Sequence, residues 1–329
     1  MTGLPRRLLC VALLLLVAPA AWAQTQITWE AYTYWPVATP AGARQFIRII
    51  DTVKQKTNGQ FVINLHLGGS LPINATSVTA AVADGVVQLA DDGFNTGNVP
   101  IAAALRLPLL LQTAEEFAKA SALLWPYLEA GYAKKGVLAL NQYAYPVQVM
   151  WSRKKLTELN DVKGMKLRVT SVEQGEFIRR AGGVPLTIGT ADVAASLDRG
   201  VVDGMLTASA GGGIPWHELV KYRYAFPVSY VNSNVVVNRE AFDKLPAEFQ
   251  KILREAAIEA ATWADGEMTR QEAEYTAQFA KEGLQLANAT AEDIQRGTDM
   301  MRSYWDEWAK KHGPDAVELM KKVRALTGR

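Results

Sequence analysis

The chain has 329 residues, with 35 lysines and arginines against 33 aspartates and glutamates, one cysteine and 49% hydrophobic residues. The near balance of charge excludes the basic surface that nucleic acids or anionic membranes require. The length and the apolar content predict a globular protein with two lobes rather than one.

The N-terminal segment has the composition of a secretory signal. Two arginines precede an apolar run from Leu8 to Val17, and Ala21-Trp22-Ala23 is a small-residue cleavage site. The run is too short for a comfortable membrane span and no later segment offers one, so we expect a protein that is not membrane-inserted. Removal of 1–23 predicts a periplasmic chain, and because Cys10 leaves with the signal, disulfides, zinc thiolates and cysteine nucleophiles are excluded.

Residues 27–90 alternate between strand and helix patterns. Thr39 is expected to cap the first helix, with Pro40 at its first position, and Asn58-Gly59 to end it. In order, the predicted elements are a strand over 27–33, a helix over 40–57, a strand over 61–67, a helix over 75–84 and a strand over 86–90.

A second series with the same order follows. Its predicted elements are a strand over 166–169, a helix over 173–181, a strand over 184–186, a helix over 191–199 and a strand over 201–206. Two βαβαβ series predict two parallel-sheet lobes, and ligands of such sheets bind beyond the carboxyl ends of the strands. Arg168, Asp91, Asp92 and Thr207 are expected at that edge.

The C-terminal quarter is helical. We expect helices from about 246 to 283, from about 291 to 312, and from Pro314 to the end. The first of these, at nearly forty residues, exceeds the usual globular length and could brace both lobes. The alternative is two ordinary helices broken near Gly266.

Arg168 is the most informative single residue. It lies in Met165-Lys-Leu-Arg-Val169, a short strand that follows a turn at Gly164. A guanidinium at the end of a core strand is costly to desolvate and needs a planar anionic partner. The sequence leaves two partners open, namely an internal carboxylate in a salt bridge and a ligand carboxylate in a cleft.

The motifs of common enzymes are absent from the sequence. The three histidines have no second histidine at metal-ligand spacing, and there is no Gly-x-Ser-x-Gly elbow or phosphate-binding glycine loop. We therefore expect no catalytic residue, no resident metal and no cofactor. Asp91-Asp92 before Gly93 has two interpretations: a site for a cation or for a ligand hydroxyl or amine, and a solvated loop with an Asx-turn.

Aromatic residues gather near the predicted strand ends. Tyr32, Tyr34, Trp35, Phe94, Trp151 and Trp216 form this set. Each alone is more often a packing residue, but together they predict a pocket wall. Trp35 and Phe94 are the members that we expect to touch a ligand, whereas the role of Trp216 stays open.

Several segments, taken in order, resemble one family. They are Asp161-Val-Lys-Gly-Met-Lys-Leu-Arg168-Val, Ala181-Gly-Gly-Val-Pro185 and Leu197-Asp-Arg-Gly-Val-Val-Asp203-Gly204, with Leu107-Pro108, Lys221-Tyr222 and Leu245-Pro246. They resemble the substrate-binding proteins of the DctP type from tripartite ATP-independent periplasmic (TRAP) transporters, over nearly the whole mature chain.

The resemblance implies an α/β bilobal periplasmic binding-protein fold that closes around a small organic acid. Its chain crosses between the lobes more than once, and a long helix commonly runs across both. The family's arginine, which matches Arg168, forms a bidentate salt bridge with the ligand carboxylate. The receptor then docks on a membrane permease.

Departures from two branches of the family narrow the ligand. Sialic-acid receptors have a second arginine where this chain has Gln148, and an asparagine where it has Thr207. Keto-acid receptors usually have Glu-Trp where this chain has Met205-Leu206. The resemblance therefore favours a compact monocarboxylate, with Gln148 and Thr207 adding hydrogen bonds to Arg168, and with Asp92, Trp35 and Phe94 selecting the rest.

The sequence thus predicts a monomeric periplasmic solute receptor. The predicted division is a signal peptide over 1–23, lobe I over 24–146 and 232–272, and lobe II over 147–231 and 273–329. A receptor for an ATP-driven importer is an alternative, and an exported α/β enzyme acting on organic acids is another. The identity of the acid and any help from a cation stay open.

Overall fold

The computed structural model describes residues 26–329, so the predicted signal peptide lies outside the described residues. Within this part nine strands form one mixed sheet in the order β2-β1-β3-β8-β4-β7-β5-β6, with β9 paired to β8. The strands are β1 (Ile27–Thr33), β2 (Phe61–His66), β3 (Leu89–Asp92), β4 (Val137–Ser152), β5 (Lys166–Val169), β6 (Val184–Thr187), β7 (Gly204–Thr207), β8 (Tyr222–Asn238) and β9 (Gln285–Asn288).

Each predicted βαβαβ series forms a parallel unit. Strand β1 lies parallel between β2 and β3, and β5 lies parallel between β6 and β7. The α/β bilobal fold is thereby confirmed, with one unit at each end of the sheet. The third strand of each unit begins about three residues later than predicted, at Leu89 and at Gly204.

Two long strands that the sequence pattern did not predict join the units. Strands β4 and β8 pair antiparallel along most of their length, and β8 continues onto β3 while β4 continues onto β7. The register of β4 shifts on both sides of Gln148. Such irregularities bend a strand and redirect its side chains, and here they fall between the two units.

Helices cover the sheet. They are α1 (Ala41–Lys56), α2 (Val78–Ala83), α3 (Ala114–Ala133), α4 (Val172–Arg180), α5 (Val193–Asp198), α6 (Ile214–Trp216), α7 (Arg239–Asp243), α8 (Ala247–Lys281), α9 (Ala291–Lys311) and α10 (Pro314–Thr327). The predicted start of α1 is one residue early, because Pro40 occupies the cap position itself and no side chain caps the helix.

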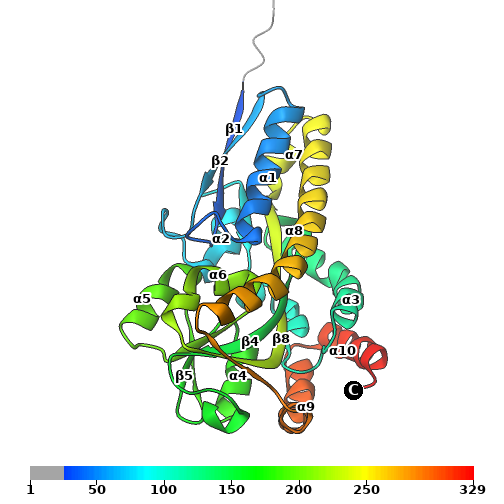
Figure 1. The fold of residues 1–329 in the computed structure, drawn as a ribbon. Helices are drawn as coiled ribbons and strands as arrows, with labels where there is room; N and C mark the ends of the chain where they lie inside the picture. Colours follow the sequence, from blue (N-terminus) through cyan, green and yellow to red (C-terminus); the bar gives the residue numbers. More distant parts are fainter. Residues whose placement is uncertain (1–25) are drawn as a thin grey trace, which may run out of the picture.

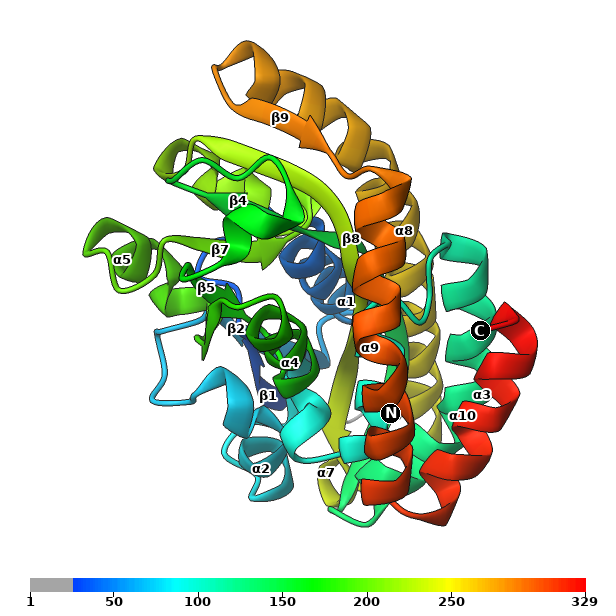
Figure 2. The same cartoon turned by 90° about the horizontal axis from the view of Figure 1, so that it is seen from below.

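Helix α8 is continuous over 35 residues, so the alternative of two helices broken near Gly266 is wrong. It packs on α1 at one end and on the segment Ser209–Gly213 at the other, with β4 between them. Figure 1 shows it running beside both lobes, and Figure 2 shows α9 beside α10. Gly266 faces open space and leaves the helix regular.

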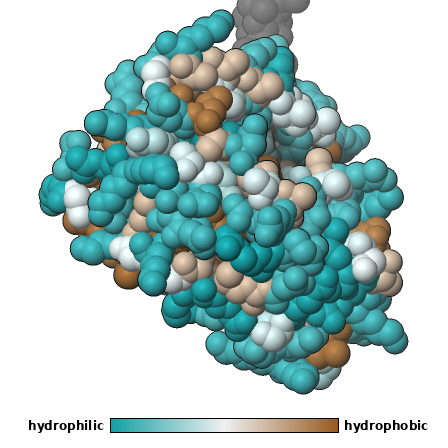
Figure 3. Space-filling view, turned by 60° about the horizontal axis from the view of Figure 1, so that its bottom comes forward, coloured by the Kyte–Doolittle hydropathy of each residue, from teal (hydrophilic) through white to brown (hydrophobic). Residues whose placement is uncertain are grey.

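The surface is mostly hydrophilic on the face that Figure 3 shows, and hydrophobic residues occur there in small separate groups. Among residues 26–329 no helix combines the length and the apolar composition needed to cross a membrane.

Candidate functional site

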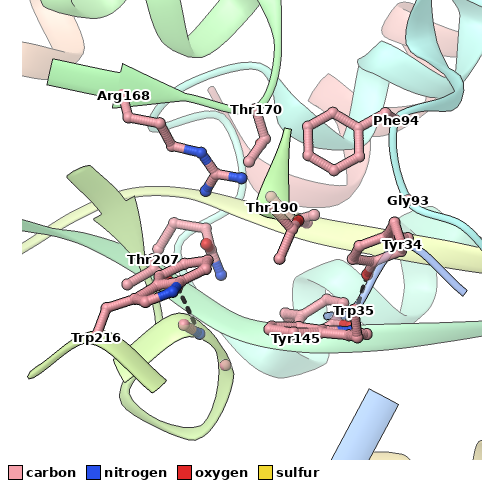
Figure 4. Close-up of a pocket in the computed structure, with 14 residues that line it drawn as sticks. Tyr34, Trp35, Gly93, Phe94, Tyr145, Arg168, Thr170, Thr190, Thr207 and Trp216 are labelled. Carbon is pink, nitrogen blue, oxygen red and sulfur yellow. Dashed lines mark hydrogen bonds between the residues drawn. The ribbon is translucent and has the colours of Figure 1, made fainter. Parts of the chain in front are cut away.

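A small pocket lies between the two parallel units. Its lining comes from segments far apart in the sequence, and Figure 4 shows these side chains converging on one space. The lining residues are Tyr34, Trp35, Gly93, Phe94, Tyr145, Gln148, Arg168, Thr170, Thr190, Thr207, Gly211, Gly212, Trp216 and Val231.

Arg168 is the one charged side chain in this lining, among the residues that the structure describes. It is 3% exposed, and its Nε donates to the carbonyl of Ile188 at 2.9 Å. Burial lowers the pKa of its guanidinium to about 10, and among residues 26–329 no carboxylate offsets that cost. The guanidinium is held by the end of β6 and points into the pocket, so an internal salt bridge is not its partner.

Aromatic rings flank this cation. The guanidinium carbon lies 5.8 Å from the centre of the Phe94 ring and 5.7 Å from that of Trp216. Trp35 stacks against Trp216 with ring centres 6.3 Å apart. A pocket lined by aromatic rings and one guanidinium suits a compact, partly apolar body with one anionic group.

Two neutral polar side chains, Gln148 and Thr207, line the same pocket. The Nε2 atom of Gln148 donates to the carbonyl of Pro146 at 2.8 Å, which directs the amide. Thr207 ends β7, and its hydroxyl accepts from the backbone N–H of Gly212 at 2.9 Å. Its own carbonyl accepts from the indole of the buried Trp151 at 2.9 Å, so Trp151 supports the wall without lining it.

The two neighbouring aspartates have a different environment from the one that the sequence predicted. Both are fully buried at the end of β3, so the interpretation as a solvated loop is wrong. Asp91 accepts from Thr33, Tyr143 and Ser233. Asp92 accepts from Thr79 and Tyr132, and the structure does not place it in the pocket lining. Within the described residues, no group of His, Cys, Asp and Glu side chains is arranged to hold a metal ion.

These aspartates predict how stability depends on pH. Burial raises the pKa of Asp91 to about 7 and that of Asp92 to about 6. A carboxyl with a raised folded pKa loses its stabilising contribution as pH climbs from its unfolded value, about 4, through the folded one. Carboxyls with lowered pKa values, such as Asp161 and Asp203, titrate below this window.

We therefore expect the melting temperature of the ligand-free protein to fall by roughly 2 °C or more between pH 5.5 and pH 8. Calorimetric scans across this range measure it. A melting temperature that stays level or rises would contradict the assignment of the two buried carboxyls.

Five of the six residues predicted from the sequence lie in the lining, namely Trp35, Phe94, Gln148, Arg168 and Thr207. Asp92 does not. Thr170 directly follows β5, and Thr190 lies three residues beyond the end of β6, so the rule that ligands bind beyond strand ends could have found them. Tyr145 had no local signal, because it lies within β4 and reaches the pocket through long-range pairing.

The sequence model of the DctP family, described as bacterial extracellular solute-binding protein, family 7, matches residues 34–311. The C4-dicarboxylate-binding periplasmic protein DctP of Rhodobacter capsulatus is 24% identical, with 87% of this chain and 88% of the relative covered. A monocarboxylate 2-oxoacid-binding periplasmic protein of Nostoc is 26% identical, with 71% and 66% covered. The crystal structure of a Bordetella pertussis extracytoplasmic solute receptor binding pyroglutamic acid shares the fold, with a TM-score of 0.85 and 24% identity over 91% of this chain and 99% of that one.

Proposed function

This chain belongs to the DctP family of bacterial extracellular solute-binding proteins, and on that premise we propose that it is the periplasmic receptor of a TRAP transporter for a small monocarboxylate. The observation that carries the proposal is Arg168, a buried cation aimed into a pocket and without a carboxylate partner among residues 26–329. A ligand carboxylate supplies the planar, bidentate anion that a buried guanidinium needs.

The pocket supports one carboxylate rather than two. Arg168 is its one cation within the described chain, and the remaining polar groups are threonines, tyrosines, a glutamine and backbone. A second ligand carboxylate would be desolvated without a counter-ion, which costs several kcal/mol in a buried site. The C4-dicarboxylate specificity of the Rhodobacter relative is therefore not carried over.

Lobe closure would bring the two walls together. In the proposed division, lobe I (24–146 and 232–272) supplies Tyr34 and Phe94, and lobe II (147–231 and 273–329) supplies Arg168 and Thr207. A ligand that contacts both walls binds the closed form better than the open one, and this difference is what shifts the population. The closed receptor would then dock on the permease.

A binding role is favoured over catalysis by the chemistry of the lining. Within the described residues the pocket has no Ser, Cys, Lys, His, Asp or Glu side chain, so it lacks the paired nucleophile and base of acyl-transfer enzymes.

A thermal-shift screen tests this function. Small monocarboxylates at 1 mM should raise the melting temperature, because a ligand that binds only the folded state stabilises it. The matched primary amides, which keep the shape and lose the charge, should not. Equal shifts from acids and amides, or shifts that persist in Arg168→Gln, would contradict the proposal.

A further inference from the structure

The pocket is bordered on one side by a chain of hydroxyl groups that leads into the core. Tyr34 and Tyr145 line the pocket, and their hydroxyl oxygens lie 2.7 Å apart. The hydroxyl of Tyr145 lies 3.1 Å from that of Tyr143, which donates to Asp91 at 2.9 Å. Figure 4 shows Tyr34 and Tyr145 on the side of the pocket away from the strand that carries Arg168.

Asp91, at the inner end of this chain of hydroxyl groups, fixes the direction in which the hydrogen bonds are donated. Three hydroxyls converge on its carboxyl oxygens, those of Thr33 at 3.1 Å, Tyr143 at 2.9 Å and Ser233 at 2.6 Å. A carboxylate can only accept hydrogen bonds, so each of these hydroxyls donates its single proton to Asp91. Burial raises the pKa of Asp91 to about 7, and the ionised form therefore prevails at pH 8.

The remaining directions follow one by one. Because Tyr143 donates its only hydroxyl proton to Asp91, the hydrogen bond between Tyr143 and Tyr145 must be donated by the Tyr145 hydroxyl. The contact between Tyr145 and Tyr34 then requires Tyr34 to donate. The indole N–H of Trp35, which can only donate, gives Tyr145 a second donor at 3.0 Å.

Tyr145 is thereby saturated, and Tyr34 is not. The Tyr145 hydroxyl donates once and accepts twice, and it is so closely packed that a Cβ at Gly42 would lie 2.3 Å from it. Tyr34 donates inward and, among residues 26–329, receives no hydrogen bond from a protein donor. A ligand group that reaches this oxygen would therefore meet lone pairs and no proton.

We propose that the site selects acids that carry a hydrogen-bond donor, an N–H or an O–H, facing Tyr34, and that it rejects isosteres with an acceptor oxygen there. This rests on the proposed function, because Arg168 must first fix the carboxylate. An acceptor opposite Tyr34 would leave two oxygens facing each other without a proton, and a buried acceptor without a partner costs the full desolvation of that group.

Two pairs of acids test the selection at pH 8. L-Pyroglutamate is compared with its lactone analogue, in which the ring N–H is replaced by oxygen, and L-lactate is compared with pyruvate. We expect calorimetry on the wild-type protein to show, in at least one pair, that the acid with the N–H or O–H group binds about 10-fold more tightly than its partner without it. In Tyr34→Phe, which keeps the ring, that preference should fall to about 2-fold or less.

Two further variants make the result specific. Asp91→Asn can donate to Tyr143 and so releases the fixed direction, and it should also reduce the preference. Tyr32→Phe is the matched control, because Tyr32 is buried nearby but donates to the carbonyl of Ile73 outside the pocket, and it should keep the preference.

Equal binding within both wild-type pairs would overturn the inference, as would a preference that Tyr34→Phe leaves unchanged. If one of these two results is found and Arg168→Gln still abolishes the binding of the acids, the proposed function stands and only the inference fails. Acids that bind equally to Arg168→Gln would instead overturn the proposed function, and a lack of binding by all four acids would count against both.

Discussion

Replacing Arg168 with lysine is expected to weaken the binding of a small monocarboxylate by about 100-fold or more, although the charge is kept. A guanidinium can present two parallel N–H groups to a carboxylate. In Arg168 the remaining Nε–H donates to the Ile188 carbonyl, which fixes the orientation of the group. A lysine ammonium on a flexible side chain provides neither the two parallel N–H groups nor the contacts of the guanidinium with the rings of Phe94 and Trp216. Loss of a charge-assisted hydrogen bond costs about 1.5–3 kcal/mol, which corresponds to about 10- to 100-fold for one bond and more for two.

Isothermal titration calorimetry with the strongest acid of the thermal-shift screen measures the change. Arg223→Lys is the matched control, since Arg223 is also buried and lies over the Trp151 ring, but pairs with Glu272 outside the lining. It should leave the dissociation constant within about 2-fold. Unchanged affinity in Arg168→Lys would show that the ligand does not use the guanidinium.

Gly204→Ala is expected to destabilise the protein by about 3 kcal/mol or more. Gly204 opens β7 and pairs with Ser152 of β4. A Cβ at this position would lie 2.0 Å from the carbonyl oxygen of Trp151 and 2.9 Å from the Cα of Ser152. Both are backbone atoms of a central strand, so relief requires β7 to separate from β4, at a cost at or above the usual range for overpacking. Thr207, at the other end of β7, would move with it.

Urea unfolding measures this loss, and Gly266→Ala is its control. Gly266 lies inside α8 with nothing within 4 Å of a Cβ, so alanine should stabilise the protein by up to about 1 kcal/mol through its helix propensity. If Gly204→Ala unfolded at the same urea concentration as the wild type, the close pairing of β7 with β4 would be wrong.

Local periodicity predicted the bounds of some elements and missed others, among them α3 and β9, which lie outside the pocket. The bounds of β1 and β5 agree with the alternation in the sequence. Strand β3 differs because Val86, which looks like a core residue, is 60% exposed, whereas Asp91 and Asp92 are fully buried. A pattern of apolar residues cannot predict buried carboxylates, since the hydroxyls that make their burial tolerable come from elements far away in the sequence.

The two joining strands escaped prediction for the same reason. Strand β8 contains Asn232, Ser233 and Asn234, all fully buried, and β4 contains Pro146 beside an irregular register. In a single sequence such residues are typical of loops. Their side chains are accommodated only because the two strands pair with each other across the lobes.

The pocket was predictable where it depends on strand ends and unpredictable where it depends on β4. Arg168 and Thr207 lie at or near the ends of β5 and β7, as the parallel topology requires. Tyr145 and its partner Tyr143 enter only through the pairing of β4, and this pairing also makes Asp91 part of a hydrogen-bond chain rather than a ligand contact.

The role of Arg168 is tested most directly by a crystal structure of the protein with its co-purified ligand, identified by mass spectrometry from the same preparation. We expect a monocarboxylate whose two carboxyl oxygens each accept from a guanidinium nitrogen of Arg168, at about 2.7–2.9 Å. A ligand without a carboxylate, or a carboxylate bound away from Arg168, would contradict it.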